Sequence, residues 1–306
     1  ELLKVYRSGD LNNAKELSLR ILQAQPDNVD AWSILGAAYI GLGQYGDATE
    51  AFKQVVKLDK ENVLGFNTLG VAYHGQGLFS EAVEALQFAI SLKEDYPEAY
   101  FNLGNVFLDQ EEWVRAIASY NNAITIKPDY SKALNNLGSA FQKNGKFVEA
   151  VATFEKALAV DPTHAAAHNN MALALQDSGR YEDALQSCQR AVALDGNHAE
   201  AFKNLGNILV DLGSLDEAEA AYEKALSINS HFPEATKALG LLKLRQQAFF
   251  EGFRLYESRW NTKKGNGVEQ KFLKPRWLGE DKKPVFLWAE QGIGDEIMFA
   301  SMIPDA

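Results

Sequence analysis

The chain contains very little cysteine, and it has no long hydrophobic segment. Cys188 is its only cysteine among 306 residues, so no disulfide can form within the chain and nothing indicates an oxidising compartment. No apolar run reaches the roughly 20 residues that a membrane-spanning helix needs, and no signal peptide is visible. We therefore expect a cytoplasmic protein without a membrane partner. The chain opens on Glu1 within a helical pattern, and we expect this N-terminus to be that of a fragment.

Positive charge is also scarce. The chain has 30 lysine and arginine residues against 41 aspartate and glutamate residues, which gives a net charge of −11. Because phosphate backbones are bound by basic surfaces, this balance argues against a nucleic-acid partner. The acidity is explained by solubility, and the alternative is a preference for cationic partners.

The histidines do not form a recognisable metal site. His164 and His168 lie four residues apart, but no HExxH motif is present and the other histidines are scattered. We expect no metal and no other cofactor.

Glycine and alanine recur with a period of 34 residues. The glycines, which we call the signature glycines, are Gly36, Gly70, Gly104, Gly138, Gly206 and Gly240, and Ala172 occupies the one slot without glycine. The alanines are Ala14, Ala48, Ala82, Ala116, Ala150, Ala184 and Ala218. A period sustained over most of a chain indicates a stacked array of repeats.

Each period predicts two helices. In residues 97–130 apolar residues recur at three- and four-residue spacing in two segments, with a short polar stretch between them. Most other repeats carry a glycine in this stretch, such as Gly145, which suits a turn with positive φ. We therefore predict an all-α solenoid of helix pairs. Its parts are a partial repeat at 1–28, repeats at 29–62, 63–96, 97–130, 131–164, 165–198 and 199–232, and a degenerate pair at 233–262.

The signature glycines predict close helix packing. Glycine inside a helix costs about 1 kcal/mol relative to alanine, so its recurrence indicates that the two helices of a pair approach closely beside a large side chain. Cys188 stands where other repeats have Phe52, Phe154 or Tyr222. We interpret it as a small buried apolar residue.

The repeat resembles the tetratricopeptide repeat (TPR) family, whose pattern is an aromatic residue, Leu-Gly, Tyr, Ala, Phe, Ala and Pro. Residues 131–164 show this pattern as Leu137, Gly138, Phe141, Ala150, Phe154, Ala157 and Pro162. The resemblance covers residues 1 to about 262 and is weakest in 165–198. It implies a right-handed superhelix whose first helices line a concave groove that binds a protein or peptide ligand.

Asparagine recurs on the predicted first helices near the signature glycines. The candidate groove residues are Asn67, Asn102, Asn105, Asn135, Asn136, Asn169, Asn170, Asn204 and Asn207. Their slots are predicted to face away from the Leu-Gly-Tyr packing stripe. An amide side chain both donates and accepts, so a ladder of asparagines suits the backbone of an extended peptide. The alternative is that these residues only join neighbouring helices.

The asparagine ladder resembles that of the O-linked N-acetylglucosamine transferase family, whose repeats also carry Asn-Leu-Gly. It is less similar to the carboxylate clamp of chaperone-binding arrays. That clamp needs flanking cations, and only Lys132 and Lys203 fit.

After Trp260 the period ends. Residues 263–283 read as a polar, mildly basic linker, and residues 284–306 read as the first strand, glycine-rich loop and helix of a truncated α/β domain. The segment WAEQGIGDEIMF resembles the start of a glycosyltransferase-like domain that is joined to TPR arrays in many bacterial proteins and is similar to heptosyltransferases. This resemblance implies that Asp295 is a base that activates a sugar acceptor. The alternative is that Asp295 only caps its helix.

Three functions stay open on the sequence. The first is a scaffold that binds an extended peptide or protein segment. The second is the acceptor-recruiting part of a TPR-containing glycosyltransferase, although the chain holds no complete active site. The third is a structural spacer or oligomerisation module. The apolar residues within 284–303 also predict self-association through that segment.

Overall fold

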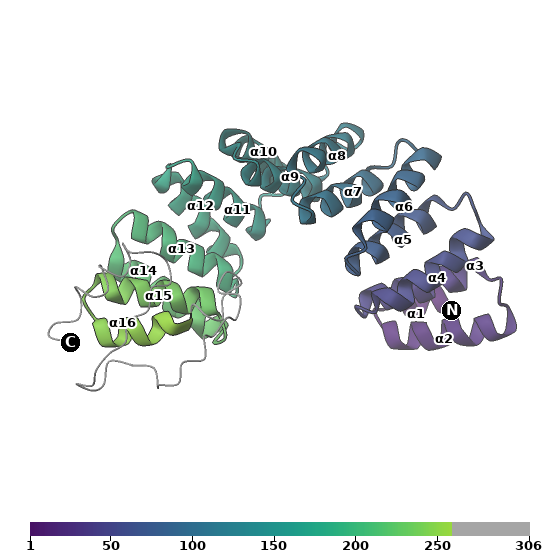
Figure 1. Ribbon diagram of the computed structural model, residues 1–306, viewed down its shortest axis with the longest axis horizontal. Coiled ribbons are helices and arrows are strands. Elements are labelled where there is room, and N and C mark those ends of the chain that lie inside the picture. The colour runs from purple at the N-terminus through teal and green to yellow at the C-terminus, as the bar shows by residue number, and fades with distance from the viewer. Residues whose placement is uncertain (259–306) are drawn as a thin grey trace, which may run out of the picture. The chain divides into compact units, whose positions relative to one another are not determined.

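The computed structural model describes residues 1–258 (Figure 1). The predicted linker at 263–283, the predicted strand–loop–helix at 284–306 and Asp295 lie outside the described residues. No β-strand occurs within residues 1–258, which confirms the all-α prediction for the repeat array.

The helices follow one another in pairs. They are α1 (Leu2–Arg7), α2 (Leu11–Ala24), α3 (Val29–Gly41), α4 (Tyr45–Leu58), α5 (Val63–Gly75), α6 (Phe79–Leu92), α7 (Pro97–Asp109), α8 (Trp113–Ile126), α9 (Ser131–Lys143), α10 (Phe147–Val160), α11 (Ala165–Asp177), α12 (Tyr181–Leu194), α13 (Ala199–Asp211), α14 (Leu215–Ile228), α15 (Pro233–Arg245) and α16 (Phe249–Tyr256). The odd-numbered helices from α3 to α15 all start at the same point of the glycine period. They are called the first helices below.

The chain divides into two compact units, Glu1–Thr163 and His164–Ala306. In both units the two helices of a pair pack against each other, and the second helix packs against the first helix of the next pair, as α6 does with α7 and α12 does with α13. Neighbouring first helices also touch, as α5 does with α7 and α11 with α13. Such nearest-neighbour packing is the property that defines a solenoid.

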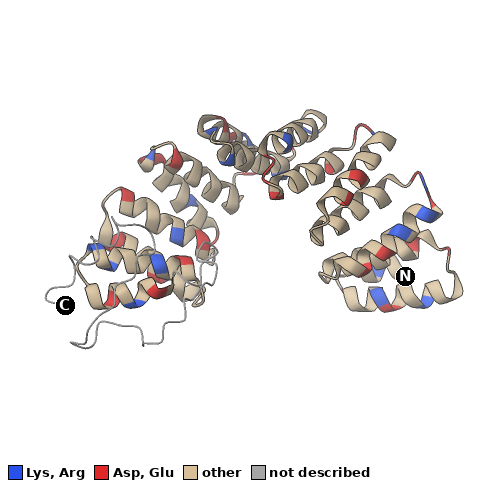
Figure 2. Ribbon diagram, viewed as in Figure 1, with Lys and Arg blue, Asp and Glu red and all other residues tan. Residues whose placement is uncertain are grey.

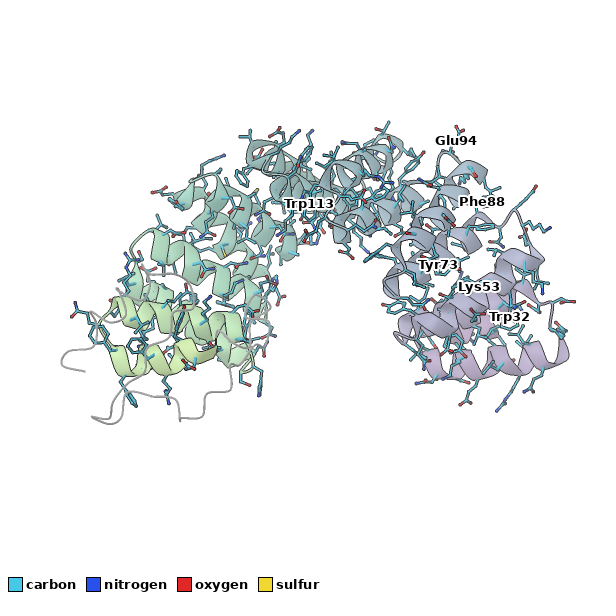
Figure 3. All side chains as sticks on the ribbon, in the orientation of Figure 1. Trp32, Lys53, Tyr73, Phe88, Glu94 and Trp113 are labelled. Carbon is cyan, nitrogen blue, oxygen red and sulfur yellow. The ribbon has the colours of Figure 1, made fainter. Side chains whose placement is uncertain are left out.

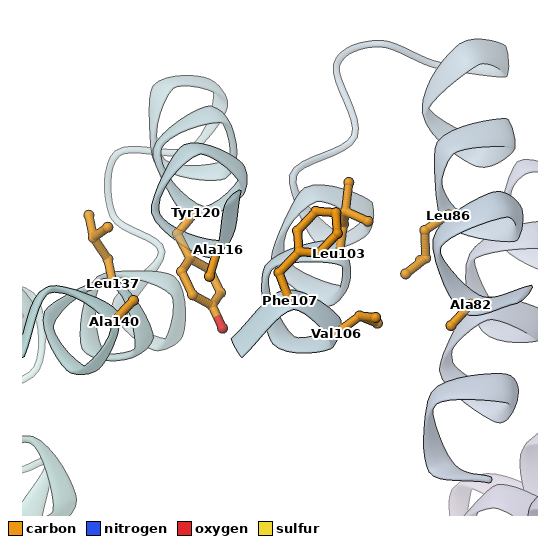
Figure 4. Close-up of a cluster of buried hydrophobic side chains, with 9 residues drawn as sticks. All are labelled: Ala82, Leu86, Leu103, Val106, Phe107, Ala116, Tyr120, Leu137 and Ala140. Atoms are coloured by element: carbon orange, nitrogen blue, oxygen red, sulfur yellow. The ribbon is translucent and has the colours of Figure 1, made fainter. Parts of the chain in front are cut away.

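The hydrophobic core runs through successive pairs rather than closing within one. One buried cluster in the first unit draws residues from four consecutive helices, α6 to α9 (Figure 4). Its members are Ala82, Leu86, Leu103, Val106, Phe107, Ala116, Tyr120, Leu137 and Ala140. A single pair cannot bury its apolar faces alone, so stability depends on the stacking of neighbours.

All the signature glycines except Gly240 allow an aromatic or leucine side chain of the second helix to lie against the first helix, whereas a methyl group at Gly240 would meet the backbone of α16. A methyl group added at Gly36 would lie 2.5 Å from the Phe52 ring, and one at Gly138 would lie 2.7 Å from the Phe154 ring. Ala172 is the exception in the glycine series, and in its repeat the matching place on the second helix holds the small Cys188. Both residues are fully buried, with 0% exposure. The two exceptions therefore compensate each other.

The turn between the two helices of a pair contains a residue in the left-handed region. Gly145 has φ +75°, as the glycine pattern predicts, whereas in residues 97–130 this place is taken by Glu111 with φ 59°. A non-glycine residue here is strained, because its Cβ approaches the following carbonyl oxygen.

Candidate functional site

The predicted groove asparagines differ in burial. Asn67, Asn169 and Asn204 are buried, with exposed fractions of 7%, 4% and 2%. The sequence pattern places them on the open face, and here the structure differs. The remaining six are half-buried, namely Asn102, Asn105, Asn135, Asn136, Asn170 and Asn207.

The buried asparagines form amide pairs that join neighbouring first helices. In the first unit Asn102 Nδ2 donates to Asn67 Oδ1 at 2.9 Å, and in the second unit Asn204 Nδ2 donates to Asn169 Oδ1 at 2.9 Å. A buried amide without a partner costs free energy, and each pair avoids this cost. The alternative role that the sequence left open, bonding between neighbouring helices, is therefore present in both units.

Two half-buried asparagines accept hydrogen bonds from buried tyrosines. Tyr120 Oη donates to Asn105 Oδ1 at 2.8 Å, and Tyr222 Oη donates to Asn207 Oδ1 at 2.8 Å. The two tyrosines are 0% and 2% exposed. Burial raises the pKa of both phenols above the ordinary tyrosine value, so both stay protonated and act as donors.

The pairing of asparagine with tyrosine is visible in the sequence once the contact is known. Among the repeats between residues 29 and 232, asparagine directly follows the signature glycine only where the second helix carries a tyrosine. Where the second helix carries Phe52 or Phe154, the same place holds Ala37 or Ser139. This correlation is the signal that identifies Asn105 and Asn207 as partners of a hydroxyl group.

The tyrosine bonds fix the orientation of two amide groups. Because the hydroxyl takes Oδ1, the Nδ2 group points elsewhere, and within residues 1–258 neither Asn105 Nδ2 nor Asn207 Nδ2 donates a hydrogen bond. Neither nitrogen is among the buried side-chain atoms that lack a partner, so solvent reaches both. Each asparagine therefore presents N–H donors at a fixed orientation.

Further contacts in the first unit extend this polar surface. Asn136 Nδ2 donates to Asn105 Oδ1 at 2.9 Å, and Asn135 Nδ2 donates to Asn136 Oδ1 at 3.1 Å. We call the half-buried asparagines on the first helices of each unit its first-helix surface. They are Asn102, Asn105, Asn135 and Asn136 in the first unit, and Asn170 and Asn207 in the second unit.

A second set of bonds joins the C-terminal ends of neighbouring first helices. His74 Nε2 lies 2.8 Å from Asp109 Oδ2, and Gln176 Nε2 donates to Asp211 Oδ2 at 2.6 Å. Neither contact can be predicted from one helix alone, because the sequence of that helix does not show which residues its neighbour brings near.

The second unit has a shallow hollow of about 380 Å³ beside Asn207. Val210 and Leu241 give it apolar walls, and Asp211 and Arg245 add charged groups of opposite sign. Leu241 is 44% exposed. An apolar hollow with a polar edge beside a fixed amide is suited to a peptide side chain.

Two findings concern metal ions and membranes. Within residues 1–258 no group of three or more His, Cys, Asp and Glu side chains is arranged to hold a metal ion. No helix in the same part of the chain is both long enough and apolar enough to cross a membrane.

Trp32 packs against the cluster that contains Leu22 and Leu35 (Figure 3). Acidic and basic residues are distributed over the helices of both units (Figure 2).

The stacked pairs place the chain among helical-repeat proteins, and comparison with family models defines the family. Models of the tetratricopeptide repeat match residues 131–164 and 163–230, and a model of the TPR repeat matches residues 38–77, 76–111 and 104–145. The matched segments run from residue 38 to residue 230. The chain belongs to the tetratricopeptide repeat family, a fold typical of protein–protein interaction.

Solved structures share this fold. A tetratricopeptide repeat protein from Parabacteroides merdae is similar with a TM-score of 0.63 and 18% identity, over 78% of this chain and 95% of that chain. YrrB, described as a TPR protein with an unusual peptide-binding site, is similar with a TM-score of 0.50 and 20% identity, over 62% of this chain and 98% of that chain. At these identities the likeness shows the fold alone.

A curated relative matches over a short segment. Protein FlbA of Caulobacter vibrioides is 40% identical over 57 residues, which is 18% of this chain and 10% of FlbA. The chain thus matches a tenth of FlbA's length.

Proposed function

We propose that the chain is a scaffold that binds an extended peptide or protein segment on its first-helix surface. One observation carries the proposal. Asn105 and Asn207 each have Oδ1 held by a buried tyrosine hydroxyl and an Nδ2 group that is neither fully buried nor hydrogen-bonded within residues 1–258. An amide that is fixed before binding loses little side-chain entropy when a ligand arrives.

The expected contact is with the peptide backbone. In an extended peptide successive C=O groups are available as acceptors, and the N–H groups of Asn105 and Asn207 are available as donors. Asn102, Asn135, Asn136 and Asn170 are the further proposed contacts. Backbone contacts are tolerant of sequence, so selectivity must come from neighbouring side chains.

The buried asparagines have a supporting role in this proposal. Asn67, Asn169 and Asn204 are members of the amide pairs that join neighbouring first helices. YrrB supports the proposal at the level of the fold.

The test uses variants that remove only the donors. Asn105→Asp and Asn207→Asp keep the oxygen that accepts from tyrosine and replace the N–H donors with a carboxylate oxygen that repels peptide carbonyls. We expect dodecapeptides selected on the unmodified chain from a random library to bind the double variant at least about tenfold more weakly, measured by fluorescence anisotropy.

The control adds the same charge at exposed asparagines outside the surface, as Asn122→Asp with Asn229→Asp. It should leave peptide affinity unchanged. Equal loss of affinity in the control and in the test variant, or recovery of no peptide by the unmodified chain, contradicts the proposal.

The other functions stay predictions. The glycosyltransferase hypothesis depends on residues 276–306 and Asp295, and self-association depends on residues 284–303, all outside the described residues. A role as spacer remains the expectation if the surface binds no ligand.

A further inference from the structure

In residues 199–232 of the second unit, a lysine of the chain lies near both a carboxylate and an aromatic ring. Glu200 is in the first turn of α13, and Lys203 Nζ lies 3.8 Å from its Oε1. The same Nζ lies 5.9 Å from the centre of the Phe232 ring. The Lys203 side chain is only 18% exposed. An ammonium group between a carboxylate and a ring face is stabilised by both.

A repeat of the first unit keeps the carboxylate and the ring but lacks the cation. Residues 97–130 have Glu98 where residues 199–232 have Glu200, and Tyr130 where they have Phe232. In place of Lys203 stands Phe101. Its ring centre lies 5.2 Å from that of Tyr130, with 41° between the ring planes.

Glu98 has no cationic partner of its own. Within residues 1–258 no lysine, arginine or histidine forms an ion pair with it. Its position in the first turn of α7 is favourable toward the helix dipole, but that interaction is also available to Glu200, which nevertheless has a lysine. The residue as a whole is half-buried.

Tyr96 completes the group. Burial first, and the negative charge of Glu98 second, raise the pKa of the Tyr96 and Tyr130 phenols above their ordinary value. Glu98 thus lies close enough to act on both tyrosines. Phe101 and Tyr130 are in ring contact, and the charge of Glu98 acts on Tyr96 and Tyr130. We call Tyr96, Glu98, Phe101 and Tyr130 the Glu98 cluster.

The chain's own lysines show that these rings accept cations. Lys93 Nζ lies 5.7 Å from the centre of the Tyr96 ring, and Lys127 Nζ lies 5.1 Å from that of Tyr130. Lys53 and Tyr73 make a similar contact elsewhere in the first unit, at 6.0 Å (Figure 3). Neither Lys93 nor Lys127 forms an ion pair with Glu98, so neither lysine neutralises that carboxylate directly.

We infer that the Glu98 cluster is a subsite for a lysine or arginine side chain of the bound peptide. This inference rests on the proposed function and adds a chemical preference to it. The incoming cation pairs with the Glu98 carboxylate, as Lys203 pairs with Glu200, and lies against the exposed edges or faces of the neighbouring rings. The net charge of −11 favours approach of such a basic segment.

The test supplies the missing cation from within the chain. Phe101→Lys reproduces the arrangement of Glu200 and Lys203, and the lysine stem can cover the apolar surface that the phenylalanine covers. Glu98→Gln removes the charge and keeps the shape. Glu200→Gln is the matched control, because its partner is already internal. Circular dichroism and thermal unfolding check that each variant is folded.

Random dodecapeptides are selected on the unmodified chain and on each variant, and their lysine and arginine content is compared with that of the starting library. We expect enrichment on the unmodified chain and on Glu200→Gln, and none on Phe101→Lys or Glu98→Gln. A selected peptide should bind Glu98→Gln about tenfold more weakly, and this difference should shrink in high salt.

The outcomes separate the two proposals. Peptides selected without enrichment of lysine or arginine, or with enrichment unchanged in folded Glu98→Gln, overturn this inference and leave the proposed function standing. Recovery of no peptide by the unmodified chain overturns both.

Discussion

The compensation between Ala172 and Cys188 predicts that the same exchange can be made in another repeat. In residues 131–164 the matching residues are Gly138 and Phe154. A methyl group at Gly138 would lie 2.7 Å from one ring carbon of Phe154 and 2.8 Å from two others. Gly138→Ala alone must therefore displace the ring, whereas Gly138→Ala with Phe154→Cys recreates the arrangement of residues 165–198.

The magnitudes follow from packing. Gly138→Ala gains about 1 kcal/mol of helix propensity and loses about 2 kcal/mol by overpacking, so it should destabilise by about 1 kcal/mol. Phe154 is 0% exposed, and Phe154→Cys should cost about 3 kcal/mol through lost burial and a cavity. In the double variant the clash is gone and the propensity gain remains, so the cost should be about 2 kcal/mol, against about 4 kcal/mol for the sum of the single changes.

The assay is urea unfolding of the single variants, the double variant and the unmodified chain, followed by circular dichroism. Only variants with unchanged urea dependence can be compared, because repeat arrays can unfold in parts. Gly46→Ala is the control. A methyl group there meets nothing nearer than 4.0 Å, so it should stabilise by up to about 1 kcal/mol. Additive single and double changes, within about 0.5 kcal/mol, would refute the compensation.

Three further outcomes follow from single positions. Glu111→Gly should stabilise by up to about 1 kcal/mol because glycine tolerates positive φ, while Gly145→Ala should destabilise by a similar amount; urea midpoints that move the other way contradict this. Burial raises the pKa of the Cys188 thiol to about 12, so a thiol reagent should label the folded chain at pH 8 far more slowly than the unfolded chain, and equal rates would show an accessible thiolate. Tyr120→Phe should destabilise by about 1 kcal/mol, because a buried hydroxyl bond is lost, and it should also weaken binding of selected peptides by freeing the Asn105 amide to rotate. Unchanged unfolding and unchanged affinity would show that this bond orients nothing.

The helix pairs could be predicted from the sequence because each packing requirement recurs in every repeat. Gly104 faces Tyr120 as Gly36 faces Phe52, so the same constraint is written many times and its period is readable. The turn glycines are readable for the same reason. The period alone does not explain why one repeat has Ala172 and Cys188 where the others have glycine and a larger residue. That explanation requires knowing that the two positions touch.

The burial of the candidate asparagines could be predicted only in part. The sequence identified the residue type and the helices, but it treated each helix as facing solvent on one side. Burial of Asn67, Asn169 and Asn204 is decided by the neighbouring first helix, which carries the other half of each amide pair. The partner asparagine lies one repeat away in the sequence, so the hydrophobic pattern of a single helix does not reveal the burial.

The same backbone frame carries different chemistry in different repeats, and this bears on how the array can be selective. In the proposed function the amides contact only peptide backbone, so by themselves they do not distinguish one sequence from another. Glu200 forms an ion pair with Lys203 of the same repeat. In the repeat of Glu98 the equivalent residue is Phe101, so the carboxylate lacks a cation although the helices are alike. Selectivity can therefore be placed on one repeat without disturbing the next, because each repeat depends for stability only on its neighbours. On this reasoning the backbone-reading amides set where an extended segment lies, and the Glu98 cluster sets which residue of that segment lies over α7.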